Sequence, residues 1–240
     1  MSAQLANLAG QASVNFMLLP LPGEQLRRVL DVGEVVRVTS LEPAFAAGEP
    51  VAHVHFPLTA IFSLVARVDG HKTVEVATVG NEGLVGLSVF LGASTTLNEA
   101  FCQVPGESLR VPAADFRRLL PETPMLRRQL ARFTQATLIQ TAQAVACNTA
   151  HTVSKRAARR LLMTQDRVGK DTFPMTQEFL GLMLGVRRAT VSEAASELQS
   201  GGLIRYSRGV MTVVDRRGLE EAACSCYAVV RAEFDELRSL

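Results

Sequence analysis

The chain has 240 residues, of which 48% are hydrophobic and 20% are charged, and its formal net charge is +2. It is long enough to bury one large or two medium cores, and no apolar run approaches the roughly 20 residues of a membrane-spanning helix. The N-terminus shows no basic segment followed by an apolar one, and the cysteines are too few and too scattered for a disulfide framework. We therefore expect a cytoplasmic protein with no membrane partner.

The first 120 residues predict a domain built mostly of short strands. A helix is expected over residues 22–32, after which apolar and polar residues alternate over short segments. The strand candidates are residues 34–38, 51–56, 60–68, 73–78, 100–104 and 108–111. Asp69-Gly70 between two of these runs is typical of a tight hairpin turn. Short strands about ten residues apart favour a small barrel or roll over a parallel sheet.

His53 and His55 fall on the same face of one expected strand, so a metal-dependent protein of the cupin type with an appended winged domain is an alternative. Such a site needs a carboxylate and a third histidine, for which Glu75 and His71 are the nearby candidates. We interpret the two histidines as partly exposed strand residues. Because the chain has no phosphate-binding glycine loop, nucleophile elbow or Ser/His/Asp grouping, the sequence predicts no catalytic residue, no metal, no cofactor and no enzyme activity.

A long helix is expected in the middle of the chain. A short helix over residues 112–120 precedes it, and the longest periodic segment then covers residues 125–148. Small and apolar side chains recur there at steps of three and four residues: Leu126, Leu130, Phe133, Thr137, Ala144 and Cys147. This stripe predicts pairing with a second copy, and packing on the strand domain of the same chain is the alternative. Another helix is expected over residues 151–166, after a hinge at residues 148–150.

Residues 176–215 have the features of a winged helix-turn-helix. Thr176 is expected to cap a short helix, Gly185 permits a tight reversal, and a second helix starts at Arg187. Apolar residues on the two helices share inward faces: Leu180, Met183, Leu184, Val191, Ala194 and Leu198. After Gly201-Gly202, residues 203–206 and 210–214 predict a hairpin that turns through residues 207–209. This hairpin is the wing.

The outward face of the second helix is suited to DNA. Arginine binds the O6 and N7 atoms of guanine, while hydroxyl groups and backbone N–H groups at a helix start suit phosphate oxygens. The side chains in question are Arg187, Arg188, Thr190, Ser192, Ser196 and Gln199. Residues 151–217 carry 12 Lys and Arg against 6 Asp and Glu, whereas residues 1–150 carry 11 against 12. Such an imbalance favours DNA binding over the alternative of an ordinary solvated helix pair.

A roll of strands, a long helix and a C-terminal winged helix, in this order, resemble the Crp/Fnr family of bacterial transcription regulators. Residues 175–191 are similar to the family's pattern of Thr, Gln, Glu, an apolar pair, Gly and an Arg-x-Thr-Val helix. Residues 79–87 resemble the glycine-bearing strand and turn that lead into the family's effector pocket. The resemblance covers the chain from about residue 18 to residue 219.

The resemblance implies an α+β fold with four parts. These are a cyclic-nucleotide-binding-like β-roll over residues 1–120, a dimerisation helix and hinge over 121–150, a winged helix-turn-helix domain over 151–220 and a helical extension over 221–240. It implies a homodimer that binds an inverted repeat in double-stranded DNA, with residues 187–199 in the major groove. RNA polymerase and a small-molecule effector of unknown identity are the further partners implied.

The resemblance also assigns roles to residues. Arg188 matches the base-reading arginine, and Thr176, Arg187 and Thr190 match phosphate-contacting positions. The set of expected DNA contacts is completed by Gln177, Ser192, Glu193 and Arg208. The effector-pocket candidates are Gly83, Leu84, Gly86, Ser94 and Thr95.

The β-roll departs from the family pattern where cyclic AMP binds. Leu84 takes the place of the expected Glu, and Ser94-Thr95 falls where an Arg-Ser or Arg-Thr pair is expected. No arginine occurs between Arg67 and Arg110, and a phosphodiester needs a cation or several well-aimed donors to leave water. Cyclic AMP is therefore not the expected effector. The iron-sulfur cluster of the oxygen-sensing branch is not expected either, because the first cysteine is Cys102.

The second helix departs from the family pattern as well. Ala189 replaces a Glu that accepts from a cytosine amino group, and Glu193 replaces a second arginine. We therefore expect a half-site different from the family's most common one.

Cys224 and Cys226 form a C-x-C pair beyond the wing. A redox switch and half of a shared metal site are two interpretations of this pair. Two cysteines cannot fill a tetrahedral zinc site alone, however, and Cys102 and Cys147 lie far away in the sequence. We interpret all four as ordinary thiols.

Overall fold

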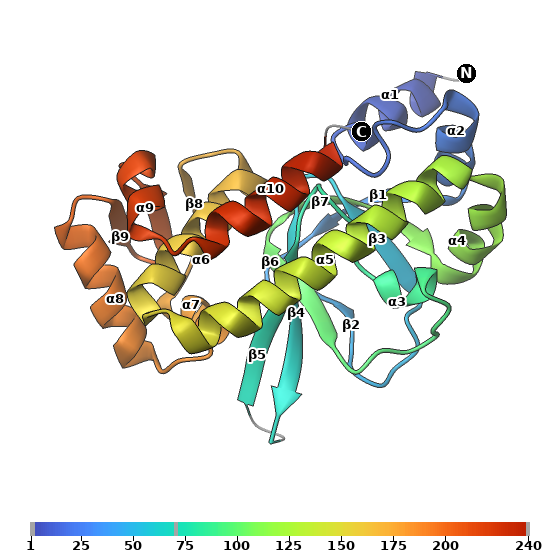
Figure 1. Ribbon diagram of the computed structural model, residues 1–240. Helices are drawn as coiled ribbons and strands as arrows, with labels where there is room; N and C mark the ends of the chain where they lie inside the picture. Colours follow the sequence, from blue (N-terminus) through green and yellow to red (C-terminus); the bar gives the residue numbers. More distant parts are fainter. Residues whose placement is uncertain (1–2, 70–71, 239–240) are drawn as a thin grey trace. The chain divides into compact units, whose positions relative to one another are not determined.

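The structure is a computed structural model that describes residues 3–69 and 72–238 (Figure 1). It divides into two compact units. Residues 1–65, 77–137 and 234–240 form the first unit, and residues 66–76 and 138–233 form the second. Within the described ranges, the helices are all too short or too polar to cross a membrane.

The first unit contains two antiparallel sheets, with the strand orders β1-β7-β3 and β2-β6-β4-β5. The strands are β1 (Glu34–Val38), β2 (Pro43–Phe45), β3 (His53–Pro57), β4 (Ile61–Val68), β5 (Lys72–Val79), β6 (Glu99–Val104) and β7 (Gly106–Pro112). The helices are α1 (Ala3–Ala12), α2 (Gly23–Val32), α3 (Leu87–Phe90), α4 (Ala113–Leu119), the 3₁₀ helix η1 (Leu120–Glu122) and the first half of α5 (Pro124–Ala150). The outer ends of β4 and β5 belong to the second unit.

The α+β fold and the roll of short strands are confirmed, since all six strand candidates are present within two residues of their expected ends. The sequence missed β2, whose three residues are too few to show alternation and whose register shifts along its length. It also missed α1, which has no acidic residue in its first turn and no basic residue in its last. Gly70 of the expected Asp69-Gly70 turn lies outside the described residues.

Aromatic side chains and one close backbone approach hold the roll together. Phe56 of β3 meets Phe116 of α4 edge to face, with ring centroids 6.2 Å apart, and both side chains are fully buried. Gly106 at the start of β7 has no room for a side chain, because a Cβ atom there would lie 2.4 Å from the backbone nitrogen of Ala60. Any larger residue at this position would push β7 away from the loop between β3 and β4.

His55 makes the stability of the first unit depend on pH. Burial lowers the pKa of His55 to about 4. Arg110 and His53 lower this pKa by smaller amounts, and Glu42 raises it. Its Nδ1 atom has no hydrogen-bond partner among the described residues. The unfolded chain binds this proton at a pKa of about 6.5, so between the two values the unfolded state holds more protons and acid destabilises the fold.

We therefore expect the free energy of unfolding to fall by about 2 kcal/mol through His55 alone between pH 7 and pH 5. Urea denaturation at both pH values measures this loss. His55→Gln, which does not titrate, should reduce the difference between pH 7 and pH 5 by about that amount. Equal pH dependence in the two proteins would show that His55 is not the group responsible.

The second unit contains the remaining elements around a small antiparallel sheet of order β8-β10-β9. They are the second half of α5, α6 (Val153–Val168), β8 (Thr172–Pro174), α7 (Gln177–Leu184), α8 (Arg188–Ser200), β9 (Ile204–Ser207), β10 (Val210–Val213), α9 (Arg216–Ala222) and most of α10 (Cys226–Arg238). The expected two-stranded wing is thus extended by β8, where Phe173 pairs with Met211. β8 has only three residues, one of them a proline, so it shows no alternation by which a strand could be predicted.

The hinge expected at residues 148–150 is wrong. Helix α5 continues through Ala150, and α6 begins after the N-cap Thr152, whose hydroxyl accepts the N–H of Lys155. The break therefore falls on His151 and Thr152. Residues 148–150 contain no Gly or Pro to stop a helix, whereas Thr152 supplies the side-chain acceptor with which a new helix starts.

The dimerisation stripe expected on α5 is also wrong. Leu126, Leu130, Phe133 and Cys147 are buried within the single chain, so they cannot contact a second copy. Phe133 packs against Gly83, where an added Cβ atom would lie 2.2 Å from its ring. The alternative interpretation, packing of the helix on its own chain, holds for this face of α5.

Candidate nucleic-acid interface

Helices α7 and α8 form a helix-turn-helix as the sequence predicts. The hydroxyl of Thr176 caps α7 by accepting the N–H of Phe179 at 3.0 Å. Gly185 ends α7 with a φ of +66°, a conformation that glycine adopts without strain. Gly181 lets the two helices meet closely, because a Cβ atom there would lie 3.1 Å from the Val186 carbonyl and 3.4 Å from Val191.

One face of this helix pair is buried and the other is open. The buried side chains are those expected from the sequence: Leu180, Met183, Leu184, Val191, Ala194 and Leu198. Arg187, Arg188 and Glu193 are exposed, and Thr190 and Ser192 are half-buried. Arg187 precedes α8 without capping it by a side-chain hydrogen bond, so the first N–H groups of α8 are open to an acceptor from outside.

Several polar side chains expected to face DNA also bond within the unit. Ser192 donates its hydroxyl proton to the amide oxygen of Gln177 at 2.9 Å, which links α8 to α7. The amide oxygen of Gln199 accepts the N–H of Tyr206 at 2.9 Å, and the Tyr206 hydroxyl accepts the N–H of Gln177 at 3.3 Å. These bonds fix the wing against both helices, a role that the sequence did not predict.

The wing ends in a two-residue turn made by Arg208 and Gly209. Ser207 pairs with Val210, and both turn residues have positive φ, +48° for Arg208 and +78° for Gly209. Two successive residues of this conformation are typical of a type I′ hairpin turn. The turn leaves Arg208 exposed at the tip of the wing.

The basic excess of this region divides into internal and free cations. Arg156, Arg159 and Arg160 are buried, and Arg216 binds Asp166 at 2.7 Å. By contrast, four exposed arginines form no ion pair within residues 3–69 and 72–238: Arg187, Arg188, Arg205 and Arg208. All four come from the helix-turn-helix and its wing, whereas the exposed Lys155 and Lys170 lie on α6 and between α6 and β8. The exposed arginines of this region that form no ion pair therefore gather on the elements expected to bind DNA. The sequence did not single out Arg205, which lies on β9.

Residues 155–222 match the family described as the Crp-like helix-turn-helix domain. Solved structures share the whole fold. FixK2 from Bradyrhizobium japonicum is 17% identical with a TM-score of 0.70, covering 81% of this chain and 98% of that one. A crp/fnr family regulator from Eubacterium rectale is 15% identical with a TM-score of 0.66 (84% and 94% covered). The c-di-GMP responsive global regulator CLP from Xanthomonas campestris is 15% identical with a TM-score of 0.66 (80% and 99% covered). The comparison with curated protein sequences gives no match.

Residues 155–222 thus form a Crp-like helix-turn-helix domain, and the chain has the fold of solved Crp/Fnr regulators. The Crp-like helix-turn-helix is a DNA-binding domain. The resemblance drawn from residues 175–191 is thus confirmed for the helix-turn-helix domain and for the fold.

The effector-pocket candidates of the β-roll differ in their exposure. Gly83, Leu84 and Gly86 are buried, and the ring of Phe133 fills the position beside Gly83. Ser94 and Thr95 are exposed on the loop before β6. Arg117 of α4 approaches the same loop and donates to the carbonyl of Ala93 at 3.1 Å, which brings a cation there that the sequence motif did not show.

The cupin-type alternative loses its carboxylate, because Glu75 forms a buried ion pair with Arg160 at 2.7 Å. Its third histidine, His71, lies outside the described residues. Within the described ranges, three or more potential metal ligands meet only at Cys147, His151, Cys224 and Cys226. Sequence distance hid this group, although the spacing of four residues between Cys147 and His151 places both on one side of a helical turn.

Proposed function

We propose that the chain is a Crp/Fnr-type transcription regulator that acts as a homodimer on an inverted repeat in double-stranded DNA. Each α8 lies in the major groove, and the two half-sites are about one helical turn, roughly 34 Å, apart. The observation that carries this proposal is the start of α8, where Arg187 and Arg188 are exposed and without ion pairs while the opposite face of the helix is buried.

Each candidate contact has a distinct chemistry in this arrangement. Arg188 binds a guanine edge, and Arg187, Thr176 and Thr190 bind phosphates around the open N–H groups of α8. The exposed carboxylate of Glu193 is suited to accept from a cytosine amino group. Gln177 and Ser192 support the helix pair through their mutual hydrogen bond. The amide N–H groups of Gln177 remain as donors to the groove, and the hydroxyl oxygen of Ser192 remains as an acceptor. Arg208 extends the phosphate contacts through the wing.

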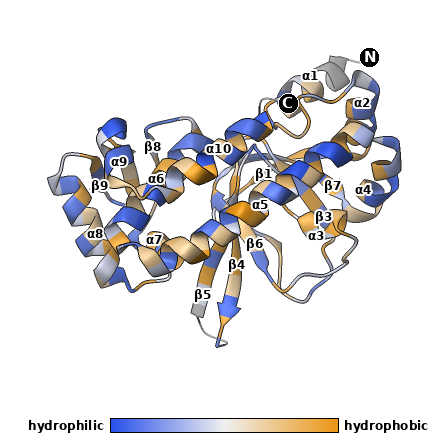
Figure 2. Ribbon diagram, in the orientation of Figure 1, coloured by the Kyte–Doolittle hydropathy of each residue, from blue (hydrophilic) through white to orange (hydrophobic). Residues whose placement is uncertain are grey.

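The second copy docks on a face of α5 that the single chain leaves open. Leu138, Ala142, Val145 and Thr149 are exposed and follow one another at steps of four, three and four residues. We call these four residues the α5 stripe. Such steps are those of the a and d positions of a paired helix, and Leu138 and Val145 are 62% and 66% exposed. The second half of α5 is also more hydrophobic than the first half, which carries three arginines (Figure 2).

The β-roll is proposed to bind an effector other than cyclic AMP, because the cassette arginine is missing and Leu84 is buried where a Glu is expected. Residues 1–120 then serve as the sensor, 121–150 as the dimerisation segment, 151–220 as the DNA reader and 221–240 as a helical extension. RNA polymerase is the partner through which a regulator of this family acts on transcription.

Selection of bound sites from random double-stranded DNA tests the proposal. The expected product is an inverted repeat whose half-sites are centred about 10 base pairs apart. Repeating the selection with a small-molecule cell extract tests the effector. Equal affinity for every oligonucleotide at physiological ionic strength would contradict sequence-specific binding.

Two substitutions separate base reading from phosphate binding. Arg188→Ala should cost about 1–3 kcal/mol of binding free energy and relax the preference at one base pair of each half-site. Arg208→Ala should weaken binding to all sequences and reduce the slope of log affinity against log salt by about one per subunit. Titration of labelled duplexes at several salt concentrations measures both effects.

Arg127→Ala is the matched control, because Arg127 is an exposed arginine of α5 outside the DNA-binding elements. It should change neither the preferred sequence nor the salt slope. An unchanged preferred sequence in Arg188→Ala would remove the base-reading assignment.

A further inference from the structure

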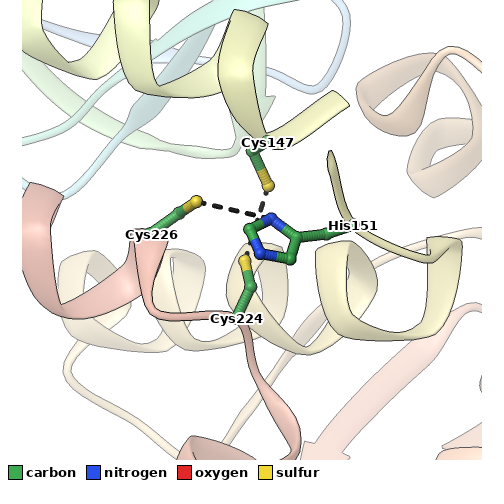
Figure 3. Close-up of side chains that lie close together, drawn as sticks. All are labelled: Cys147, His151, Cys224 and Cys226. Carbon is green, nitrogen blue, oxygen red and sulfur yellow. Dashed lines mark hydrogen bonds between the residues drawn. The ribbon is translucent and has the colours of Figure 1, made fainter. Parts of the chain in front are cut away.

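Four potential metal ligands from separate segments of the second unit point toward one another (Figure 3). Cys147 comes from the last turn of α5, and His151 comes from the break between α5 and α6. Cys224 comes from the segment between α9 and α10, and Cys226 is the first residue of α10. The three thiols are buried and the imidazole is half-buried. Their four ligand atoms all lie within 4.8 Å of one another.

The spacing of these atoms is that of a single tetrahedral ion. Zinc bonds of about 2.3 Å to sulfur and about 2.0 Å to nitrogen place two sulfurs about 3.8 Å apart, and a sulfur and a nitrogen about 3.6 Å apart. The Sγ atoms of Cys147 and Cys224 are 3.4 Å apart, and the Sγ of Cys226 is 3.6 Å from Nδ1 of His151. An iron-sulfur cluster holds its ligands farther apart, because several iron atoms lie between them.

Two buried cations beside the thiols supply an independent observation. Arg156 and Arg159 are 8% and 3% exposed, and neither forms an ion pair with a carboxylate in the described part of the chain. The Nε atom of each lacks a hydrogen-bond partner there as well. Arg156 acts electrostatically on Cys147 and Cys224, and Arg159 acts on Cys147 and Cys226.

A buried charge is costly unless an opposite charge lies close to it. Three thiolates and a neutral imidazole around a divalent ion carry a net charge of −1, whereas three protonated thiols carry none. A metal-thiolate centre therefore gives these two guanidinium groups the counter-charge that the surrounding protein does not provide.

The side chain of Gln143 completes the surroundings of the cluster. Its Nε2 donates to the sulfur of Cys226 at 3.0 Å. Hydrogen bonds of this kind to a coordinating atom orient metal ligands and stabilise thiolates. Gln143 lies one helical turn before Cys147 on α5, so the same helix supplies one ligand and the donor to another.

We propose that Cys147, His151, Cys224 and Cys226 bind one zinc ion. Four protein ligands fill the tetrahedral shell, so the ion has a structural role with no position open for a substrate. It fastens the junction of α5 and α6 to the junction of α9 and α10. The site replaces the sequence-based interpretation of these cysteines as ordinary thiols, and it does not depend on the proposed DNA site.

Metal analysis of the full chain, purified without a histidine tag, tests the site directly. The expected content is one zinc ion per chain, released when the thiols are titrated with a mercurial reagent. Cobalt exchanged into the same protein should show the visible bands of a tetrahedral ion and a thiolate charge-transfer band. These spectra use the native chain, so they remain decisive if a variant fails to fold.

Substitutions then assign the ligands. Cys224→Ser and His151→Ala should lose the zinc, and His151→Cys should keep it with an altered cobalt spectrum. Cys102→Ser is the matched control, because Cys102 is a buried cysteine of the first unit that donates to the carbonyl of Val104 and lies outside the cluster. It should keep a full complement of zinc. Gln143→Ala should retain the site but weaken zinc affinity by about 10- to 100-fold.

Three outcomes would overturn the proposal. One is a protein that is free of metal and does not take up added zinc or cobalt. Another is a native disulfide between Cys147 and Cys224, which would make the pair a redox element. The third is iron together with acid-labile sulfide in place of zinc.

Discussion

Replacing Glu75 by glutamine is expected to lower the free energy of unfolding by about 3–5 kcal/mol. Glu75 of β5 and Arg160 of α6 lie in the second unit with 0% and 5% of their side chains exposed, and their charged atoms are 2.7 Å apart. Burial lowers the pKa of Arg160 to about 10, although the nearby carboxylate of Glu75 raises it. The guanidinium therefore stays charged at neutral pH. Without the carboxylate this charge is buried and uncompensated.

Urea denaturation at pH 7 measures the loss. The double variant Glu75→Leu with Arg160→Met should recover most of it, because both charges and both desolvation costs are removed together. Glu221→Gln is the matched control, since Glu221 pairs with Arg217 on the surface and such pairs contribute about 0.5 kcal/mol or less. A loss in Glu75→Gln no larger than in this control would refute a stabilising buried pair.

This ion pair shows what local sequence patterns cannot reveal. Glu75 and Arg160 are separated by more than eighty positions, and the sequence treated the first as a possible metal ligand and the second as one more cation of a basic region. Alternation of apolar residues predicts that a strand covers residue 75, but it does not predict which helix lies against that strand. Pairings at such separations depend on packing, which single-sequence periodicity does not contain.

The helix-turn-helix was predictable because its signals are local. Thr176 as a cap, Gly185 as the turn residue and the apolar steps of α8 each act within a few positions, and each is present as expected. Arg188 could be placed on the open face for the same reason. The proposed zinc ligands could not be predicted from local signals, because Cys147 and Cys224 come from different segments of the chain.

Helix α5 marks the boundary between the two cases. Its existence and length follow from periodicity, yet the choice of which face meets the chain's own roll does not. From the sequence, the most apolar face was assigned to the dimer interface. That face is instead buried within the single chain, where Phe133 packs against Gly83. A single helix offered two apolar faces, and the packing within each unit determined which one stayed open: Phe133 lies against Gly83 in the first unit, and Cys147 lies with Cys224 and Cys226 in the second.

Placing charges on the α5 stripe is expected to abolish the dimer. In Leu138→Glu with Val145→Glu, two carboxylates per chain would have to leave water and enter the proposed apolar helix pair next to two from the other copy, which is unfavourable through both desolvation and repulsion. Because a dimer binds two half-sites through one association, the monomer should bind the inverted repeat about 10²- to 10⁴-fold more weakly. Analytical ultracentrifugation and duplex titration measure the two effects.

The control distinguishes a lost dimer from a damaged fold. Leu97→Glu introduces the same charge at a leucine that is 85% exposed but lies on the loop before β6 and not on α5, and it should leave both mass and affinity unchanged. In the stripe variant, affinity for an isolated half-site should also be retained, since α8 and its arginines are untouched. A stripe variant that remained dimeric would remove this face from the interface, and a monomeric one with full affinity for the inverted repeat would show that the two reading helices bind independently.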